Sequence, residues 1–581
     1  MIFQPKQNRK ADSLDRLFLY ITGFISPHLT DVDKHSLSQT TSVSYLYSMQ
    51  QYGIPHKTTN RLPFLASRLI HSDPLLDGFY RPFQNRPDSA HIKQQQDRFT
   101  TQHRENLVNV ISQQYQHIQD VPKEQIDALR SPNSFTITTG HQLNLFTGPL
   151  FFLYKIIDVI QIAAKWNTQK DGNTYVPVFW MASEDHDLEE INHFTVEGQT
   201  IHWPNESEGP VGRMSTEGLD LVLKTWKRHL GKRPHAKELQ ELFEQSYCKH
   251  SNLADATRFL VHQLFGSYGL VIVDGDDPQL KQQFATYVQK ECEEKVIQTA
   301  SESIMKRLEK AFQKKMKPQV NPRDVNLFYM GGSGRQRITK TNDGYDVVQT
   351  TTSFTKKEFV AALQKHPERF SPNSLLRPIF QEVVLPNLVY VGGGSELAYW
   401  LQLCEAFSSF DLPIPMLKLR SSLLLVSDKQ HRKLKSLGIS PADLFLPSNE
   451  LINRRVRQIS NIEIDLSSLK MQLGDQFAHL YDLAKQTDAS FLGAVKAQEK
   501  KQTKGIKNLE KRLLKAQRKK LADHVKRITE LQQQLFPLGD LQERRVNFAA
   551  FILQYGDDFI PTLIKHIDPF NKDFVCLCFS K

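Results

Sequence analysis

The sequence has 581 residues and a formal net charge of +11, and 39% of its residues are hydrophobic. A chain of this length is too long for a single compact core, so we expect about two or three domains. No run of about 18 uncharged apolar residues occurs, which excludes a membrane-spanning helix. The five cysteines lack the spacing of a zinc site, and the N-terminus lacks the apolar core of a signal peptide. We therefore expect a cytoplasmic protein with reduced thiols.

The N-terminal region, residues 1–57, is polar, rich in Ser, Thr and Gln, and only weakly periodic. Segments of this composition bury too little apolar surface to fold by themselves. Residues 1–57 are therefore predicted to be a polar, mobile extension or to lie upstream of the true start, and the folded core is predicted to begin at residue 58.

The most informative stretch runs from Thr138 to His193. A β-prone segment, 135–139, breaks at Gly140, and an apolar helix continues to about residue 165. A second apolar strand, 176–182, then stops at a dense acidic cluster. This order of strand, loop, helix and strand predicts a parallel sheet, in which ligands bind beyond the carboxyl ends of the strands. Both polar clusters fall there, so the stretch is predicted to carry the functional site.

The acidic cluster after the second strand is Glu184-Asp185-His186-Asp187. Three interpretations stay open, because these side chains can bind a divalent ion, position an ammonium group or only solvate a loop. Zinc favours a cleaner set of His and Cys ligands, whereas Mg²⁺ accepts one or two carboxylates. Zinc is therefore not expected, Mg²⁺ stays open, and contact with a substrate is the interpretation that we favour.

The loop after the first strand begins with Gly140-His141-Gln142. His141 can donate to a phosphate, exchange a proton near neutral pH, or only cap the loop. Asn144 and Thr147 can cap the next helix, and Lys155 is either a ligand or a lysine on the helix face.

Two glycine-rich turns follow further along the chain. Gly392-Gly393-Gly394 joins a strand to a helix, and a helix N-terminus of this kind is where an anion or a nucleotide is usually held. Gly331–Gly334 lies between β-prone segments, where it can cradle a phosphate through backbone N–H groups or simply close a hairpin. Because the turn at Gly392 repeats the strand–loop–helix order seen at Gly140, we favour it as the second half of the site.

The sequence pattern changes at Asp465, after which leucines recur at heptad spacing. This spacing predicts an antiparallel coiled coil over residues 465–535, made of two long helices that turn near Gly505. Residues 536–581 are predicted to pack back at the base of the coil.

The coiled coil has an apolar stripe that Phe477, Ala484 and Phe491 widen beyond a single seam. A stripe of this width needs a partner, and a second copy of the chain is the commonest one. The sequence therefore predicts a homodimer through the first, less basic helix of the arm.

The positive charge is concentrated in the same region. Between Lys496 and Arg527 the sequence has thirteen Lys or Arg and three Asp or Glu, a balance of +10 out of the total of +11. A basic coiled coil can grip RNA or an anionic surface, but few aromatic residues interleave with these cations. A binding scaffold is therefore the alternative hypothesis, and solvated lysines without a nucleic-acid partner are the expectation.

Several motifs occur together as they do in one known family. They are Gly140-His141-Gln142, Phe146 to Pro149, Pro177 to Asp187, Glu190 to His193, Pro322-Arg323, Leu376-Arg377-Pro378, Gly392-Gly393 with Glu396, Ala398-Tyr399-Trp400 and Leu541 to Phe548. Through these motifs residues 58–581 resemble the BshC family, the cysteine-adding enzymes of bacillithiol biosynthesis.

The resemblance implies an α/β fold with a Rossmann-like parallel-sheet core over residues 58–464. It also implies connecting-peptide insertions at about 192–250 and 318–375, and a C-terminal coiled-coil arm used in dimerisation. The implied activity is a ligase that joins L-cysteine to glucosaminyl malate through an amide bond. Because amide formation from a free carboxylate in water is uphill, ATP or another adenine nucleotide is expected to drive it.

The candidate site residues come from the two polar clusters and the glycine-rich turn. The candidate catalytic residues are Glu184, Asp185, His186 and Asp187. The candidate substrate- or nucleotide-binding residues are Gly140, His141, Gln142, Asn144, Thr147, Gly148, Lys155, Asn192, His193, Asn387, Gly392, Gly393, Glu396, Tyr399 and Trp400. No residue is predicted to be a dedicated metal ligand.

Overall fold

The computed structural model describes residues 48–580 except 207 and 333, so residues 1–47 of the expected extension lie outside the described residues. Its central feature is a six-stranded parallel sheet. The strands are β2 (Arg81–Pro82), β3 (Ser134–His141), β4 (Thr174–Met181), β7 (Val271–Asp274), β13 (Asn387–Gly392) and β14 (Met416–Leu419). Strands β3, β4, β7 and β13 are buried along nearly their whole length, as expected when helices cover both faces of a parallel sheet. The predicted parallel α/β core is confirmed.

The strand order, β2-β14-β13-β3-β4-β7, reverses direction at β3. From β3 the chain moves outward to β4 and β7 on one side, whereas β13 and β14 lie on the other side. A crevice opens beyond the carboxyl ends of the strands at such a switch point. The loops after β3 and β13 flank it.

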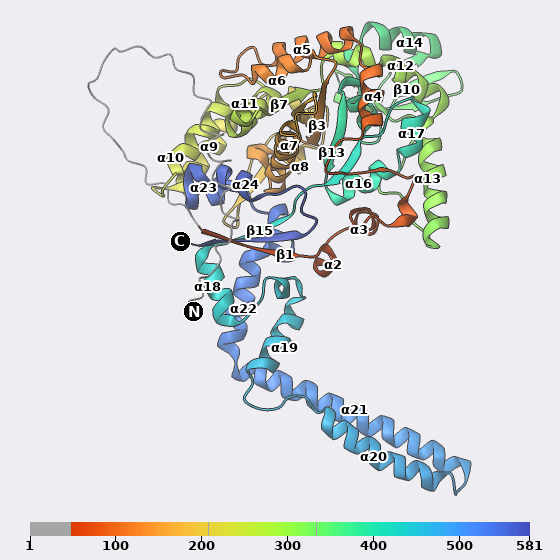
Figure 1. The fold of residues 1–581 in the computed structure, drawn as a ribbon, viewed down its shortest axis with the longest axis vertical. Helices are drawn as coiled ribbons and strands as arrows, with labels where there is room; N and C mark the ends of the chain where they lie inside the picture. Colours follow the sequence, from red (N-terminus) through yellow and green to blue (C-terminus); the bar gives the residue numbers. More distant parts are fainter. Residues whose placement is uncertain (1–47, 207, 333, 581) are drawn as a thin grey trace, which may run out of the picture. The chain divides into compact units, whose positions relative to one another are not determined.

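Helices cover this sheet (Figure 1). They are α3 (Phe64–Ile70), α4 (Ser89–Arg98), α5 (Thr101–Gln114), α6 (Lys123–Ala128), α7 (Phe151–Asn167), α11 (Leu253–Phe265), α12 (Pro278–Glu294), α13 (Val296–Phe312), α15 (Arg377–Val384), α16 (Gly394–Leu401) and α17 (Cys404–Ser409). Helix α7 packs on β3 and β4, and α5 and α11 pack on β7. Among the described residues, no helix is both long and apolar enough to cross a membrane.

Two insertions interrupt the sheet. The first, between β4 and β7, comprises α8 (Leu188–Ile191), the hairpin of β5 (His193–Val196) and β6 (Gln199–His202), α9 (Leu219–Leu230) and α10 (Ala236–Phe243). The second, between β7 and β13, carries an antiparallel sheet of β8 (Leu327–Gly331), β9 (Gly334–Lys340), β10 (Gly344–Val347), β11 (Ser353–Thr355) and β12 (Phe370–Pro372), with α14 (Lys356–Lys365). Gly331 pairs with Gly334, so the glycine-rich turn closes the β8–β9 hairpin.

A separate three-stranded sheet joins the two ends of the described chain. It has the order β1-β16-β15, from β1 (Ser48–Ile54), β16 (Phe574–Ser580) and β15 (Leu423–Val426), and the short helix α2 (His56–Thr59) follows β1. Residues 48–57 are therefore folded and do not belong to a mobile extension. Their polar composition hides the strand, because β1 is an edge strand whose Gln50 and Gln51 side chains reach solvent.

The arm is an antiparallel hairpin of α20 (Ser467–Ala484) and α21 (Ala489–Lys520), shown in blue in Figure 1. Tyr481 donates to Glu499 at 2.5 Å, and Lys470 pairs with Glu510, so the two helices run in opposite directions. The chain turns at residues 485–488 and not near Gly505, which lies inside α21.

The three residues that were expected to widen the apolar stripe of the arm beyond its seam lie differently. Phe477 and Ala484 are buried together with Val495, so they form the seam and do not widen it, whereas Phe491 stays 41% exposed. The base of the arm is a second apolar core, to which α18 (Asp428–Leu437), α19 (Ser448–Ile459) and α22 (Ala522–Leu535) contribute.

The C-terminal segment, residues 536–581, divides between the two cores. Phe536 and one face of strand β16, with Cys576 and Cys578, belong to the apolar core at the base of the arm, and the other face of β16, with Leu577 and Phe579, packs on the core around the central sheet. Helices α23 (Ala549–Tyr555) and α24 (Phe559–His566) pack instead on the core around the central sheet. The predicted packing at the coil base thus describes only part of this segment, because its amphipathic helices cover the large domain.

A buried carboxyl group in α15 allows a prediction about stability. Glu382 is fully buried, and Asn387 and Gln381 donate to its Oε1 at 2.7 and 3.0 Å. Burial raises the pKa of Glu382 from 4.5 to about 8. Because the folded pKa lies above the unfolded one, the folded state binds this proton more tightly. The stability that the proton confers is therefore complete below pH 4.5 and is lost as the pH rises through about 8.

Glu382→Gln keeps the shape of the side chain and removes its titration. We expect the melting temperature of the wild type to fall more steeply than that of the variant between about pH 5 and pH 8. Glu294→Gln, at an exposed carboxylate, serves as the control and should keep the wild-type slope. Equal slopes for wild type and Glu382→Gln would contradict the raised pKa.

Candidate active site

A cavity of about 400 Å³ lies at the carboxyl edge of the central sheet, at the switch point beside β3. Its lining comes from the loops after β3 and β4, from the second insertion and from α15 and α16. The predicted residues among the lining are His141, Gln142, Glu184, Asp185, His186, Glu396 and Tyr399. The structure therefore brings the two polar clusters and the helix after the glycine-rich turn around one space.

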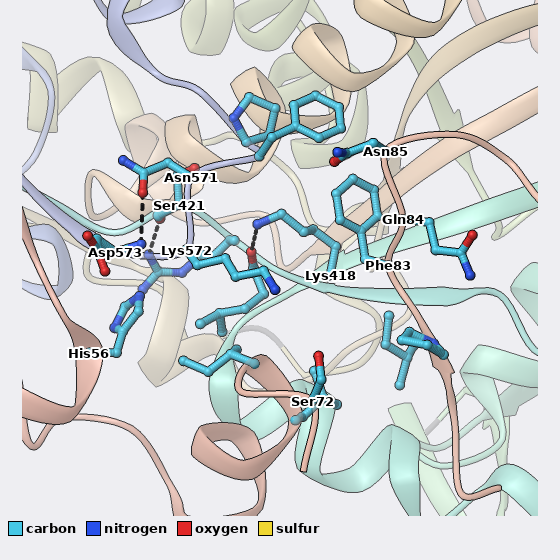
Figure 2. A pocket seen from close by; sticks show the side chains of 18 of the residues that line it. His56, Ser72, Phe83, Gln84, Asn85, Lys418, Ser421, Asn571, Lys572 and Asp573 are labelled. Carbon is cyan, nitrogen blue, oxygen red and sulfur yellow. Dashed lines mark hydrogen bonds between the residues drawn. The ribbon is translucent and has the colours of Figure 1, made fainter. Parts of the chain in front are cut away.

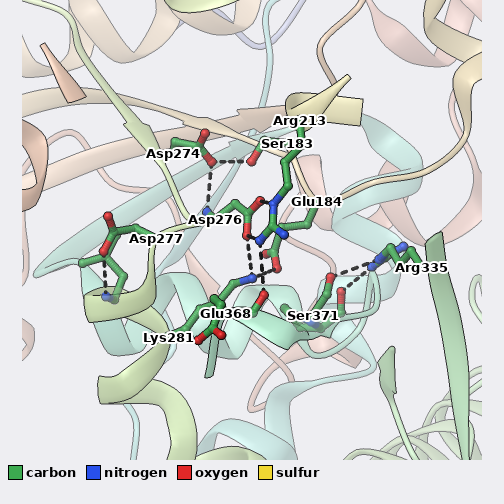
Figure 3. A network of polar contacts seen from close by, with 12 residues as sticks. Ser183, Glu184, Arg213, Asp274, Asp276, Asp277, Lys281, Arg335, Glu368 and Ser371 are labelled. Carbon is green, nitrogen blue, oxygen red and sulfur yellow. Dashed lines mark hydrogen bonds and ion pairs between the residues drawn. The ribbon is translucent and has the colours of Figure 1, made fainter. Parts of the chain in front are cut away.

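Glu184 is fixed by a buried ion-pair network (Figure 3). Lys281 of α12, only 3% exposed, lies 2.8 Å from Glu184 and 2.6 Å from Asp276. Arg213 holds Asp276 from the other side with two hydrogen bonds of 2.6 and 2.7 Å. The network connects the ends of β4 and β7, so the position of Glu184 at the cavity is set by a fixed ammonium partner.

Asp185 is held as an ionised carboxylate. Its Oδ2 accepts a hydrogen bond from Gln142 at 2.9 Å, and its Oδ1 accepts one from the backbone N–H of His186 at 2.8 Å. Burial alone would raise the pKa of Asp185, but hydrogen bonds from His186 and Gln142 and the charge of Arg335 hold it well below its usual range. A carboxylate of this kind is a poor general base and a good partner for a cationic amine.

His141 stays neutral at physiological pH. Burial, with help from the charge of Lys155, lowers the pKa of His141 to about 4. Its Nδ1 lies 2.9 Å from the carbonyl oxygen of Gln142, so Nδ1 donates and the proton of the neutral ring sits there. Since the ring carries no charge near neutral pH, it cannot bind a phosphate as a cation.

Lys155 and Glu396 form an ion pair beneath the cavity. Lys155 is 1% exposed, and its Nζ lies 2.8 Å from Glu396 Oε1 and 2.5 Å from the carbonyl oxygen of Gly140. Glu396 Oε2 in turn accepts a hydrogen bond from the backbone N–H of Gly393 at 2.7 Å. The N-terminus of α16, where Gly392 and Gly393 were expected to receive an anion, is thus occupied by the protein's own carboxylate.

The far end of the first loop lies away from the cavity. Phe146 packs among Phe194, Trp226, Phe243 and Phe548, with ring centroids 4.9 to 5.5 Å apart. Because Phe146 is anchored in this aromatic cluster, the neighbouring residues of the loop are also buried. The predicted binding residues Asn144, Thr147 and Gly148 are consequently buried in the loop and do not line the cavity.

The loop after β3 and the C-terminal segment are joined by hydrogen bonds. Asn547 Nδ2 donates to the carbonyl oxygens of Phe146 and Gly148, at 2.7 and 2.6 Å, and Asn144 Nδ2 donates to the carbonyl oxygen of Glu190 at 3.1 Å. Gly148 has a φ of +63°, and a Cβ there would lie 2.7 Å from Asn144. These residues therefore act as a structural brace.

Five further predicted residues also lie outside the cavity lining. Asp187 caps the short helix α8, and Asn192 and His193 belong to its end and to the start of β5. Trp400 is buried in the core against Tyr390, with ring centroids 4.2 Å apart. Asn387 is the first residue of β13, so it lies at the amino edge of the sheet and the site lies at the carboxyl edge.

Three arginines of the cavity were missed by the sequence reasoning. Arg323 and Arg335 belong to the second insertion, and Arg377 begins α15 and donates to the Tyr399 hydroxyl at 3.1 Å. A signal existed, because Pro322-Arg323 and Leu376-Arg377-Pro378 are among the motifs that carry the family resemblance. Cations from the insertion thus face the acids of the central sheet.

A second cavity, of about 300 Å³, lies beyond the carboxyl end of β14 (Figure 2). It shares no lining residue with the first. Lys418, Arg420 and Lys572 line it together with Phe83 and Phe570, whose ring centroids are 5.5 Å apart. Asp573 also lines it, and Arg420 is already paired with Glu543 at 2.7 Å.

Within the described parts of the chain, no group of three or more His, Cys, Asp or Glu side chains is placed to hold a metal ion. The acids nearest the cavity are instead paired with Lys281 and Gln142.

A switch-point cavity at the carboxyl edge of a parallel sheet, ringed by opposed acids and arginines, defines a Rossmann-like enzyme. Residues 49–421 match the N-terminal Rossmann-like domain of bacillithiol biosynthesis BshC, and residues 423–579 match its C-terminal coiled-coil domain. The chain therefore belongs to the BshC family, and it is a ligase of that family.

Relatives from three bacteria each have the name "Putative cysteine ligase BshC". The Flavobacterium johnsoniae protein is 47% identical, over 83% of this chain and 91% of its own length. The Christiangramia forsetii protein is 45% identical, over 91% of this chain and 99% of its own length. The Cytophaga hutchinsonii protein is 35% identical, over 81% of this chain and 88% of its own length.

Proposed function

We propose that this protein joins the carboxyl group of L-cysteine to the sugar amine of glucosaminyl malate and so forms bacillithiol. The observation that carries the proposal is the set of opposed charges around the first cavity. Asp185 and Glu184 lie at the ends of the sheet, and Arg323 and Arg377 lie on the segments that face them. The two proposed substrates bring two amines and three carboxyl groups, which need both kinds of partner.

The arginines are suited to the carboxylates of the malyl group. Arg377 donates one side-chain hydrogen bond within the described part of the chain, to Tyr399, and its remaining N–H groups are available to a ligand at the cavity. A guanidinium binds a carboxylate through two parallel hydrogen bonds, which fixes its orientation as well as its position. Asp185, already ionised, is suited to orient an incoming amine.

Activation of the cysteine carboxyl is proposed to use ATP, with Mg²⁺ brought by the nucleotide. The nucleotide would turn one carboxylate oxygen into a good leaving group. Arg323, exposed at the first cavity, fits a phosphate as well as it fits a carboxylate. The side chains of Asp185 and Arg377 would meanwhile hold the two substrates so that the amine faces the activated carboxyl group.

A reconstituted assay tests this function. The purified chain is given L-cysteine, glucosaminyl malate and Mg²⁺, with ATP or without it, and the products are separated by liquid chromatography and mass spectrometry. We expect bacillithiol only with ATP, together with AMP or ADP in equal amount. No product with any nucleotide, combined with undiminished bacillithiol in a deletion strain, would remove the proposal.

The cytoplasm is the proposed location. All five cysteines are free thiols, and Cys576 and Cys578 lie with their sulfur atoms 3.9 Å apart without forming a disulfide. Unpaired neighbouring thiols fit a reducing compartment, where disulfides are rare.

A homodimer through the arm is also proposed. Leu469 and Leu483 are 48% and 43% exposed, and they lie on one face of α20 because fourteen positions separate them. Apolar side chains repeated at this spacing favour a second helix as partner. We expect the wild type to be a dimer by light scattering at micromolar concentration, and Leu469→Glu/Leu483→Glu to be a monomer.

The control for the arm is Leu221→Glu. Leu221 is 62% exposed on α9 and should leave the dimer intact when it is replaced. A monomeric wild type, or a double variant that stays dimeric, would show that this face of α20 is not the interface.

A further inference from the structure

A guanidinium from the second insertion reaches the histidine of the acidic cluster. Arg335 Nη1 lies 2.9 Å from His186 Nδ1. Arg335 stands on β9, whereas His186 lies in the loop between β4 and α8, so their contact joins the insertion to the central sheet. Sequence patterns gave no sign of it.

The guanidinium is held rigidly. Arg335 Nε donates to Ser371 Oγ at 3.0 Å, and Nη2 donates to the carbonyl oxygen of Pro372 at 2.8 Å. The ring of Phe328 lies 4.0 Å beneath the guanidinium carbon, and the side chain is only 6% exposed. With these contacts fixed, Nη1 is left to point at His186. The hydrogen bond between Arg335 and Ser371 is seen in Figure 3.

The direction of this hydrogen bond determines where His186 carries its proton. A guanidinium has only N–H donors and stays protonated in proteins. His186 Nδ1 must therefore be the acceptor and must carry a lone pair. The proton of the neutral ring then sits on Nε2, and a second proton on Nδ1 would place two donors and two positive charges face to face.

The neighbouring carboxylate does not reverse this assignment. Asp185 Oδ1 lies 3.6 Å from His186 Nδ1, which is longer than a hydrogen bond, and it already accepts the backbone N–H of His186. Asp185 also faces Arg335, with 3.9 Å between Oδ1 and Nη1. The acid thus helps to hold Arg335 in place beside the imidazole.

We propose that Arg335 is a positioning residue that locks His186 into the tautomer with the proton on Nε2, and that His186 acts in the cavity as a hydrogen-bond donor. Among the described residues Nε2 makes no hydrogen bond, so its N–H is available to an oxygen of a bound ligand. In the ligase reaction, on which this second half of the proposal rests, that oxygen belongs to the cysteine carboxyl. Oxyanion-type donation at that atom assists attack by the amine.

The pairing with His141 strengthens the assignment. His141 donates from Nδ1 to Gln142, so its free Nε2 is an acceptor, whereas the free Nε2 of His186 is a donor. Both rings belong to the lining of one cavity. The site thus offers one histidine that accepts a hydrogen bond and one that donates. Because Nε2 of His186 already carries a proton, His186 is excluded as the residue that takes a proton from the amine.

Nitrogen chemical shifts of the imidazole rings test the tautomer directly. In two-bond ¹H–¹⁵N spectra of protein labelled with ¹⁵N-histidine, His186 is assigned by the signal lost in His186→Gln. We expect the pattern of an Nε2–H ring in the wild type at pH 7. Arg335→Met should convert it to a mixture of tautomers, and Arg335→Lys, which keeps a donor and a charge, should restore part of the original pattern.

Arg337→Met provides the matched control, because Arg337 is exposed on the same strand and should leave the His186 signals unchanged. An Nδ1–H or doubly protonated ring in the wild type would overturn the proposal, as would an unchanged pattern in Arg335→Met. In the assay, Arg335→Met should lower kcat at least tenfold more than it raises KM. These spectra need no substrate, so they keep their meaning if the chain turns out to catalyse a different reaction.

Discussion

Under the proposed function, Arg377→Ala is expected to lower kcat/KM for glucosaminyl malate by about 100-fold or more. Arg377 is partly buried at the start of α15, where Tyr399 holds one of its N–H groups and the cavity receives the others. Truncating one partner of a desolvated, hydrogen-bonded charge pair costs about 2 to 5 kcal/mol, and about 1.4 kcal/mol corresponds to a factor of ten. The loss should appear mainly in KM for the malate-bearing substrate and not in KM for cysteine.

Two further variants complete this experiment, one as a control and one with an intermediate expected loss of kcat/KM. Arg369→Ala removes an exposed arginine of the second insertion, which makes a surface ion pair with Glu368 and a 3.4 Å hydrogen bond to the Tyr329 hydroxyl, and it should change kcat/KM less than twofold. Tyr399→Phe keeps Arg377 and removes one of its supports, so an intermediate loss is expected. Equal KM increases for both substrates in Arg377→Ala would mean that Arg377 does not distinguish the malyl group from cysteine.

The part of the site that lies on consecutive strands could be predicted from the sequence. The acids after β4 and the loop after β3 each follow a strong apolar strand, and the parallel topology brings strand ends together by itself. Glu184 and Gln142 therefore meet at the cavity as expected. The arginines do not follow from this logic. Arg323 and Arg335 lie on the second insertion, whose docking places them near the acids, and Arg377 begins a helix and does not follow a strand.

The errors at other positions have local physical causes. Asn387 is polar and adjoins an apolar strand, but it is the first residue of that strand, and only the direction of the chain separates the two edges of a sheet. The first loop carries polar residues of the right kind, yet Phe146 buries its far end in an aromatic cluster. Neither outcome can be read from residue type alone.

The turn of the arm is a different case, since its signal was present in the sequence. Asp488 accepts a hydrogen bond from the backbone N–H of Ser490 at 2.8 Å and caps α21, as an Asp at an N-cap does. The expected turn near Gly505 rests on glycine, which disfavours helices by about 1 kcal/mol. A long helix tolerates that cost at an exposed position. The chain therefore turns before the N-cap at Asp488, and Gly505 stays inside the helix.

Lys281→Ala is expected to reduce the unfolding free energy of the large domain by about 3 to 5 kcal/mol. Its ammonium lies 2.8 Å from Glu184 and 2.6 Å from Asp276, and both acids are buried. Removing the lysine leaves one positive partner, Arg213, for two negative charges in a region that water does not reach freely. The denaturant midpoint at pH 7 should fall accordingly.

The effect should shrink in acid. Burial by itself would raise the pKa of Asp276, but the charges of Lys281 and Arg213 outweigh burial and hold this pKa below 3.8. In the wild type, the stability from the pairing of Asp276 with these cations is therefore present above pH 3.8. It is lost as the pH falls through the pKa that Asp276 has in the folded state. In Lys281→Ala the unpaired acids take up protons more readily. The gap between variant and wild type should therefore be smaller at about pH 4.5 than at pH 7.

Lys281→Met/Glu184→Gln separates the lost charge from the lost packing. It removes one charge of each sign and keeps the apolar stem, so much of the stability should return while activity stays low. Recovery of stability would identify the uncompensated carboxylate as the source of the defect, because an apolar replacement of a buried ion pair is often neutral. If Lys281→Ala were as stable as the wild type at pH 7, water must reach Glu184 and take the place of the ammonium, and its carboxylate would then be free to move in the cavity.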